Sequence, residues 1–164
     1  MVECVKKLLL GQFEAALAMF NDCVRKCPAD HWDGNIAKYP FWQVAYHTLC
    51  FVDLYLSPDE KTHQLRTDLH PKGWSELDDE YPSRRFEQRE ITQYIGICLQ
   101  KARDILAAET RESLEGASGH ARRTFSRAEL HVYNIRHIMH HTGQLSAYLR
   151  RVGVDADWVS SGWR

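Results

Sequence analysis

Apolar residues recur every three or four positions in four separate stretches of this chain, and this spacing constrains the fold more than any other feature. The first stretch runs from Val2 to about Lys26 and is stopped by Pro28. Because residues three and four apart share one face of an α-helix, each stretch predicts a helix with one buried face. Short alternating runs bounded by hairpin turn pairs are missing, so the predicted fold class is all-α.

The second and third stretches have recognisable ends. The second begins at Tyr39-Pro40, where proline suits a first helical turn, and ends at Ser57-Pro58. The third starts after Tyr81-Pro82-Ser83 and carries an apolar stripe from Phe86 to Leu106. A polar connection, Glu109 to Gly119, follows it.

The fourth stretch has the clearest beginning. It opens with Ser126-Arg127-Ala128-Glu129, a capping box in which Ser and Glu satisfy free backbone N–H groups reciprocally. It closes with Arg150-Arg151 and Gly153, as expected for a helix C-terminus. These signals predict a helix between the two.

The connection between the second and third helices, from Ser57 to Pro82, is long at about 25 residues. An extended segment of this length can span a helix of roughly 37 Å, so it can carry the chain back along a bundle. The second and third helices therefore need not be antiparallel neighbours. With 164 residues, 44% of them apolar, the chain suffices for one core, and we predict a single four-helix-bundle domain over residues 1–164.

The charge balance argues against two classes of partner. Lys and Arg number 21 and Asp and Glu 22, so no global field attracts nucleic acid or anionic lipid. No apolar run approaches the ~18 residues of a membrane span. The five cysteines are odd in number and mostly lie in helical stretches, and Gln12 and Glu14 interrupt a faint imitation of a signal peptide. We expect a cytoplasmic protein that binds neither nucleic acid nor membranes.

Nine histidines stand out because imidazole suits proton transfer and metal ligation near neutral pH. His137 and His141 are four residues apart, about 40° apart on one helix face, so both rings can reach one ion. Four further side chains fall near the same face: Leu130, Asn134, Leu145 and Tyr148. We therefore expect the pair to point toward the bundle interior.

A third histidine makes a metal site the better interpretation. On its own, a pair at this spacing is more often a polar helix face or a satisfied core histidine. His47, however, lies in mid-helix between Val44 and Phe51 on an apolar face. If the second and fourth helices are antiparallel neighbours, three imidazoles converge and leave at least one coordination position for water or substrate.

These residues carry a resemblance to a known family. His137-Ile-Met-His-His-Thr-Gly-Gln-Leu145, together with His47 in Trp-Gln-Val-Ala-Tyr-His, resembles the DinB/YfiT-like proteins, a superfamily of four-helix bundles that includes metal-dependent enzymes. The resemblance covers the whole chain in helix order. It implies a long connection between helices two and three, and a divalent metal held by His47, His137 and His141.

The resemblance also bears on the neighbours of the ligands. It implies that Gln144 is a motif residue near them, and Asn134 is a second candidate because it falls near the same face. Thr142 stands where Arg is frequent in the family, which leaves the ligands intact and removes any role of that Arg. The sequence identifies no catalytic residue besides the ligands.

Two functions remain open. The resemblance implies a metal-dependent enzyme in which zinc, or nickel, iron or copper, activates a thiol or water, either a thiol transferase or a hydrolase. It would use a small-molecule substrate, take a low-molecular-weight thiol as co-substrate, and form a homodimer. The alternative is a non-catalytic metal- or ligand-binding bundle that acts as a dimeric interaction or scaffold domain.

The remaining chemistry-bearing residues have ordinary interpretations. His140 lies about 100° round the helix from His141 and is expected to face a neighbouring helix or solvent. Cys23, Cys27 and His31 step by four, but Pro28 breaks the helix between them, so packing is favoured over a second metal site. The acidic run Asp78-Asp79-Glu80 is expected to be a solvated loop.

Two further sets lie outside the predicted helix centres. Five histidines are expected to be solvated: His31, His63, His70 and His120 in connections and His131 in the first turns of the fourth helix. Four tryptophans are expected to cover the bundle ends, or to line a substrate entrance or dimer contact: Trp32, Trp74, Trp158 and Trp163.

Overall fold

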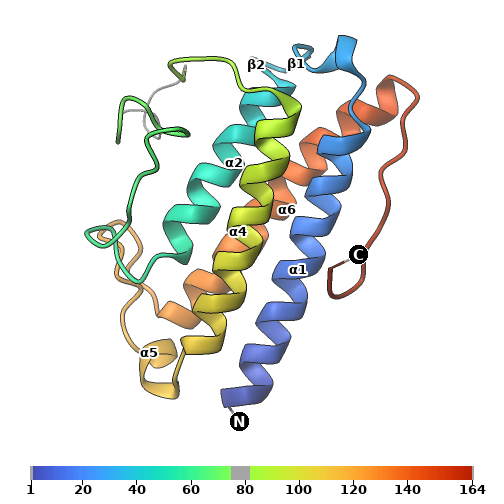
Figure 1. Ribbon diagram of the computed structural model, residues 1–164. Helices are drawn as coiled ribbons and strands as arrows, with labels where there is room; N and C mark the ends of the chain where they lie inside the picture. Colours follow the sequence, from blue (N-terminus) through green and yellow to red (C-terminus); the bar gives the residue numbers. More distant parts are fainter. Residues whose placement is uncertain (1, 75–81, 164) are drawn as a thin grey trace.

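The computed structural model describes residues 2–74 and 82–163 and shows four long helices packed side by side (Figure 1). They are α1 (Val2–Lys26), α2 (Phe41–Leu56), α4 (Gln88–Ala108) and α6 (Arg127–Arg151). The prediction of an all-α four-helix bundle with a long connection after the second helix is therefore confirmed. None of the described helices combines the length and the apolar character needed to cross a membrane.

The long connection returns the chain to the end of the bundle where α2 began (Figure 1). Cys98 Sγ lies 3.8 Å from the Leu49 carbonyl oxygen, and four residues after Leu49 the Asp53 carboxylate meets Lys101 of α4 at 2.5 Å. The two helices therefore run in the same direction. Both α1 and α2 contact α4 and α6, which makes α2 and α6 neighbours.

The helix ends follow the predicted signals, with one shift. Ser126 Oγ accepts a hydrogen bond from the Glu129 N–H at the start of α6, one of the two bonds of a capping box. The third helix, however, begins at Gln88, because a reciprocal capping box between Glu87 and Glu90 satisfies its first free N–H groups. Phe86 therefore precedes the helix, although it is fully buried.

The expectation that nothing forms a sheet is wrong in one detail. Two-residue strands, β1 (Asn35–Ile36) and β2 (Tyr39–Pro40), pair in an antiparallel ribbon between α1 and α2. Strands this short show no alternation that a sequence pattern could reveal. Ala37, in the turn between them, has a φ of 53°, a conformation that only the backbone geometry shows. A short helical turn, η1 (Ala29–His31), precedes the ribbon.

The polar stretch predicted as a connection contains a short helix, α5 (Arg111–Glu115), beside a buried ionic cluster. Glu109 Oε1 lies 2.9 Å from Arg127 Nε and 2.8 Å from His131 Nε2. The Arg127 guanidinium also donates to three carbonyl oxygens at the end of α2: those of Tyr55, Leu56 and Ser57. This cluster thus joins the end of α4, the start of α6 and the end of α2.

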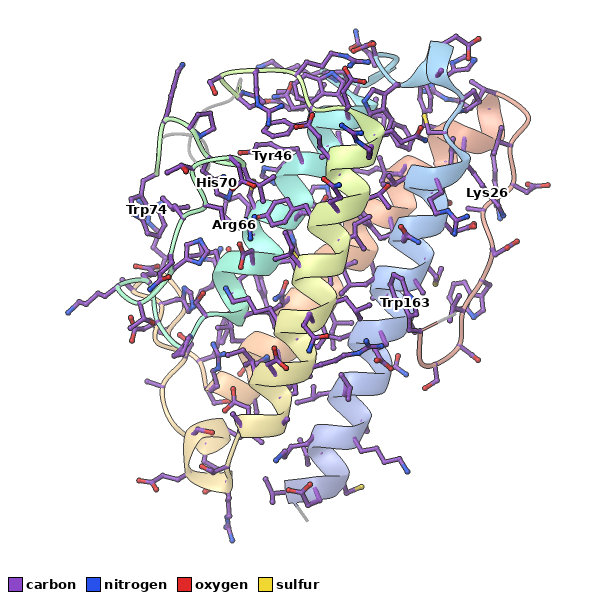
Figure 2. The ribbon with its side chains drawn as sticks, in the orientation of Figure 1. Lys26, Tyr46, Arg66, His70, Trp74 and Trp163 are labelled. Carbon is purple, nitrogen blue, oxygen red and sulfur yellow. The ribbon has the colours of Figure 1, made fainter. Side chains whose placement is uncertain are left out.

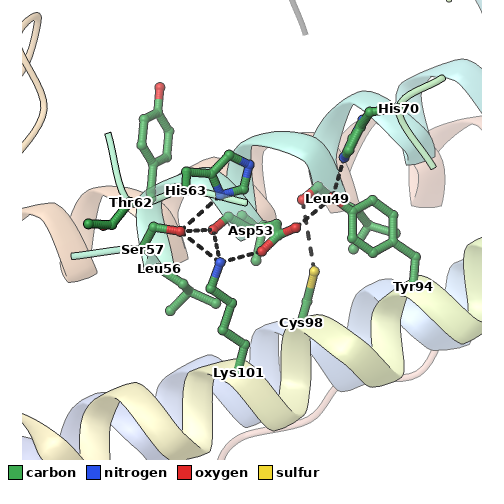
Figure 3. A network of polar contacts seen from close by, with 12 residues as sticks. Leu49, Asp53, Leu56, Ser57, Thr62, His63, His70, Tyr94, Cys98 and Lys101 are labelled. Carbon is green, nitrogen blue, oxygen red and sulfur yellow. Dashed lines mark hydrogen bonds and ion pairs between the residues drawn. The ribbon is translucent and has the colours of Figure 1, made fainter. Parts of the chain in front are cut away.

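The expectation that the five histidines outside the helix centres are solvated is wrong for four of them. The four are buried: His63, His70, His120 and His131. Figure 3 shows why for two, because His63 Nδ1 lies 2.9 Å from Ser57 Oγ and His70 Nε2 lies 3.2 Å from Tyr94 Oη. Such rings can satisfy polar groups of the helices, so burying them costs less than burying unpaired imidazoles.

The four tryptophans have different environments. Trp32 is buried at the end of the bundle and donates from Nε1 to the Phe86 carbonyl at 2.9 Å, as expected for a residue that covers this end. Trp163 packs beside α1, in the segment that follows α6 back along that helix (Figure 2). Trp74 and Trp158 are exposed.

Candidate metal centre

Three histidines from α2 and α6 meet at the edge of the contact between these helices. One potential ligand atom from each of His47, His137 and His141 lies within 4.8 Å of the others. The ring centroids of the helical pair are 4.6 Å apart, and that of His47 lies 5.1 Å from His141 and 5.9 Å from His137. The expected convergence depends on α2 and α6 being antiparallel neighbours, and they are (Figure 1).

The histidine cluster reaches the surface, so the expectation of a fully interior site is wrong. His47 is exposed and the other two histidines are half-buried. All three lie at the edge of the contact between α2 and α6, whereas positions further round each helix, such as Leu49 and Leu145, enter the core. A small molecule can therefore approach the three imidazoles without an opening of the bundle.

Two aromatic rings of α2 pack beside the histidine cluster, one and two helical turns after His47. The Phe51 ring centroid lies 4.9 Å from that of His47 and 5.8 Å from that of His137. The Tyr55 ring lies 6.3 Å from His137. These rings reduce the access of water to one side of the histidine cluster.

Electrostatics keep the three imidazoles neutral at pH 7. Desolvation and then the neighbouring His141 lower the pKa of His47 to about 4. Desolvation and the neighbouring histidines lower the pKa of His137 to about 3. Desolvation also lowers the pKa of His141, although its hydrogen bond to Gln144 opposes the change. Neutral imidazole is the form that can donate a lone pair to a metal ion.

Of the two residues expected beside the ligands, Gln144 contacts a histidine of the cluster and Asn134 bonds elsewhere. His141 Nδ1 donates to Gln144 Oε1 at 2.8 Å, because an amide oxygen can only accept. This bond leaves Nε2 of His141 with the free lone pair. Asn134 is buried and donates from Nδ2 to the Val52 carbonyl at 3.2 Å, which links α6 to α2.

The donor set fits a first-row divalent ion. Three imidazoles and no carboxylate make up the cluster, a set used by zinc and other borderline metals. In addition, His137 Nδ1 is buried with no hydrogen-bond partner among the described residues. A metal ion could satisfy such a nitrogen if it is the ligating atom, so the three residues could hold one.

The other residues considered as metal ligands do not belong to the three-histidine cluster. His140 is exposed and is not part of the three-histidine cluster; its Nε2 lies 3.4 Å from Gln144 Nε2. Burial raises the pKa of both Cys23 and Cys27 to about 12, and His31 Nδ1 lies 3.0 Å from Tyr148 Oη. Across residues 2–74 and 82–163 no second group of three potential ligands comes together. The acidic run Asp78–Glu80 lies outside the described residues.

Three residues beside the site were not anticipated: Tyr55, Tyr133 and Arg123. Arg123 donates to Tyr55 Oη at 2.9 Å and to Tyr133 Oη at 3.2 Å. Helical spacing could have found the tyrosines, since Tyr133 precedes His137 by four residues and Tyr55 follows His47 by eight. Arg123 lies in the connection before α6, where no periodicity indicates its position.

Comparison with known proteins identifies one relationship. The model of the DinB family matches residues 1–163, which is nearly the whole chain. No curated protein and no solved structure matches the sequence of this chain. The match agrees with the four-helix bundle and with the three-histidine cluster between α2 and α6. The chain therefore belongs to the DinB family.

Proposed function

We propose that this protein is a metal-dependent enzyme in which His47, His137 and His141 hold one divalent ion. We favour zinc over nickel, iron or copper. The observation that carries the proposal is the convergence of three imidazoles from two helices within 4.8 Å of one another. Structural zinc sites use four protein ligands, whereas catalytic sites use three and leave a position open. The exposure of His47 would leave that position accessible to a small molecule.

A bound divalent ion would supply positive charge that favours the deprotonated form of a thiol or water beside it, which makes either a nucleophile at neutral pH. The protein's own residues would orient the ligands and shield the ion from water. Gln144 would fix the orientation of His141 by accepting from Nδ1. Phe51 packs against His47 and would limit the access of water to one side of the histidine cluster, which favours transfer to a substrate over hydrolysis. We therefore favour a thiol-dependent transferase over a hydrolase.

Metal analysis of single variants tests the proposal. Purified untagged protein should contain about one equivalent of a first-row metal, and His47→Ala or His137→Ala should remove most of it while the helical circular dichroism stays unchanged. His140→Ala is the matched control, because it removes an exposed imidazole next to His141 and should keep the metal. Metal content that is low in the wild type, or that neither ligand variant changes, would contradict the proposal.

The partners follow the same proposal. We expect a small-molecule substrate, a low-molecular-weight thiol as co-substrate and a homodimer. Metal retention without turnover of any thiol would instead favour the non-catalytic bundle, which would act as a metal- or ligand-binding scaffold.

A further inference from the structure

The guanidinium groups of Arg123 and Arg136 both pack against the ring of Tyr133. Tyr133 precedes His137 by one helical turn. The Arg123 Cζ lies 4.9 Å from the Tyr133 ring centroid, and the Arg136 Cζ lies 5.3 Å from it. Two positive charges thus lie against one aromatic ring, and like charges repel each other unless something between them is negative. The tyrosine ring, with its partial negative face, only partly offsets this repulsion.

No carboxylate of the described residues neutralises the pair. Neither Arg123 nor Arg136 has an ion-pair partner within 4.0 Å in residues 2–74 and 82–163, whereas six of the other eleven arginines there do. Instead, the tyrosine hydroxyls hold Arg123, and its buried Nε–H has no acceptor among the described residues. Such an unpaired donor is costly, so its retention needs an explanation.

The arginine pair lies beside the three-histidine cluster. Tyr55 lies near both the histidines and Arg123, because its ring centroid is 6.3 Å from that of His137 and 5.5 Å from the Arg123 Cζ. Tyr133 and His137 are four residues apart and therefore lie on the same face of α6. A single extended small molecule could therefore reach from the three imidazoles to Arg123.

The charge of the surrounding groups favours an anion on the Tyr133 side. The only acidic residue of α2 is Asp53, and its carboxylate bonds Lys101 and Tyr94 of α4 (Figure 3). Arg123 also lines a hollow of about 720 Å³, together with Lys61 and three carboxylates, those of Asp59, Glu60 and Glu115. The carboxylates there outnumber the two cations, so the side of Arg123 that faces Tyr133 is the better position for an anion.

We propose that Arg123, assisted by Arg136, binds the oxyanion of a small-molecule substrate, a carboxylate or a phosphate, while the reacting group lies at the three histidines. This inference rests on the proposed function, and it narrows the substrate to an anionic one. Arg123 is then a specificity-determining residue. Tyr55 and Tyr133 are positioning residues, because they hold the guanidinium through their hydroxyl oxygens.

The first test needs no metal. In metal-free ¹⁵N-labelled protein, the Arg123 Nε–H signal, assigned by its loss in Arg123→Gln, should shift as inorganic phosphate is added. Arg122→Gln is the matched control: it removes one exposed positive charge at the adjacent position and should leave the titration unchanged. The absence of any phosphate-dependent shift at Arg123, or its equal loss in Arg122→Gln, would overturn the inference whether or not the protein binds metal.

The second test uses zinc-loaded protein and a series of ω-mercapto acids of three to six carbons, each compared with its neutral amide. At least one acid should bind about tenfold more tightly than its amide in calorimetry, and Arg123→Gln should abolish this preference without changing the zinc content or the amide affinity. Equal affinities for every acid and amide would overturn the inference. Loss of zinc in the wild type, with the phosphate shift retained, would instead refute the proposed function alone. Phosphate binding without any acid preference would identify an adventitious ion only.

Discussion

At the scale of single residues, the properties of the site come from what each imidazole touches. The sequence spacing pairs His137 with His141, but only the hydrogen bond to Gln144 decides which nitrogen of His141 is free. Asn134 lies on the same helix and was an equal candidate in the sequence, yet it bonds the α2 backbone. Contacts of this kind depend on side-chain direction, which residue spacing predicts only approximately.

Gln144→Ala should weaken metal binding without abolishing it. Partners that orient a ligating histidine typically contribute about 10–100-fold to metal affinity. We therefore expect a loss in that range, measured by competition with a chromophoric chelator. Gln100→Ala changes an exposed glutamine of α4 and should leave the affinity unchanged. An unchanged affinity in Gln144→Ala would show that this hydrogen bond does not orient the ligand.

At the scale of the elements, the bundle depends on a polar junction as well as on apolar stripes. Arg127 donates to the last carbonyl groups of α2, which have no partner within that helix, and to Glu109 at the end of α4. The capping pattern Ser126-x-x-Glu129 predicted the start of α6. It did not predict that the next residue, Arg127, would be buried and join three helices.

Arg127→Met should destabilise the protein strongly. The substitution keeps much of the side-chain volume but leaves Glu109 buried with an incomplete set of donors and the α2 carbonyls unpaired. Breaking a buried ion pair in this way typically costs about 3–5 kcal/mol. Urea denaturation should show a loss of this size. Arg111→Met removes an exposed pair with Glu115 and should cost less than about 1 kcal/mol. Equal effects of the two substitutions would contradict the proposed role of the junction.

At the scale of the whole molecule, the connections are part of the packed structure. The loop histidines His63 and His120 are buried, as is His131. Burial lowers the pKa of His63 to about 4 and also lowers the pKa values of His120 and His131. The connections are therefore docked on the helices by neutral imidazoles, and the stability of the bundle should depend on their remaining neutral.

The free energy of unfolding should fall as the pH decreases from about 6.5 toward 4. In this range the unfolded histidines, with pKa values near 6.5, bind protons that the folded ones exclude, so stability rises with pH. Each histidine contributes up to about 1.4 kcal/mol per pH unit. Urea titrations of metal-free protein at pH 7.0, 5.5 and 4.5 measure the slope. His63→Gln should reduce it, whereas His140→Gln, at an exposed position, should not. A wild-type slope of zero above pH 5 would contradict this prediction.

Below this range a second group should contribute. Burial alone raises the pKa of Glu109, but the hydrogen bonds from His131, Ser113 and Arg127 outweigh it and lower the pKa to about 2. Its contribution to stability is complete above about pH 4.5 and is lost as the pH falls toward 2. The acid unfolding of the bundle should therefore begin with the histidines and end with this carboxylate.

The sequence by itself determined the local features: four helices, their approximate ends, and the pairing of His137 with His141. These depend on residues three or four positions apart and on capping groups, so they are contained in short segments. Only the tertiary structure decided that His47 lies opposite this pair, that the site opens to solvent, and that Arg123 lies beside Tyr55. These contacts join residues far apart in the chain, and they follow from the direction in which α2 and α6 pack, which no local pattern specifies.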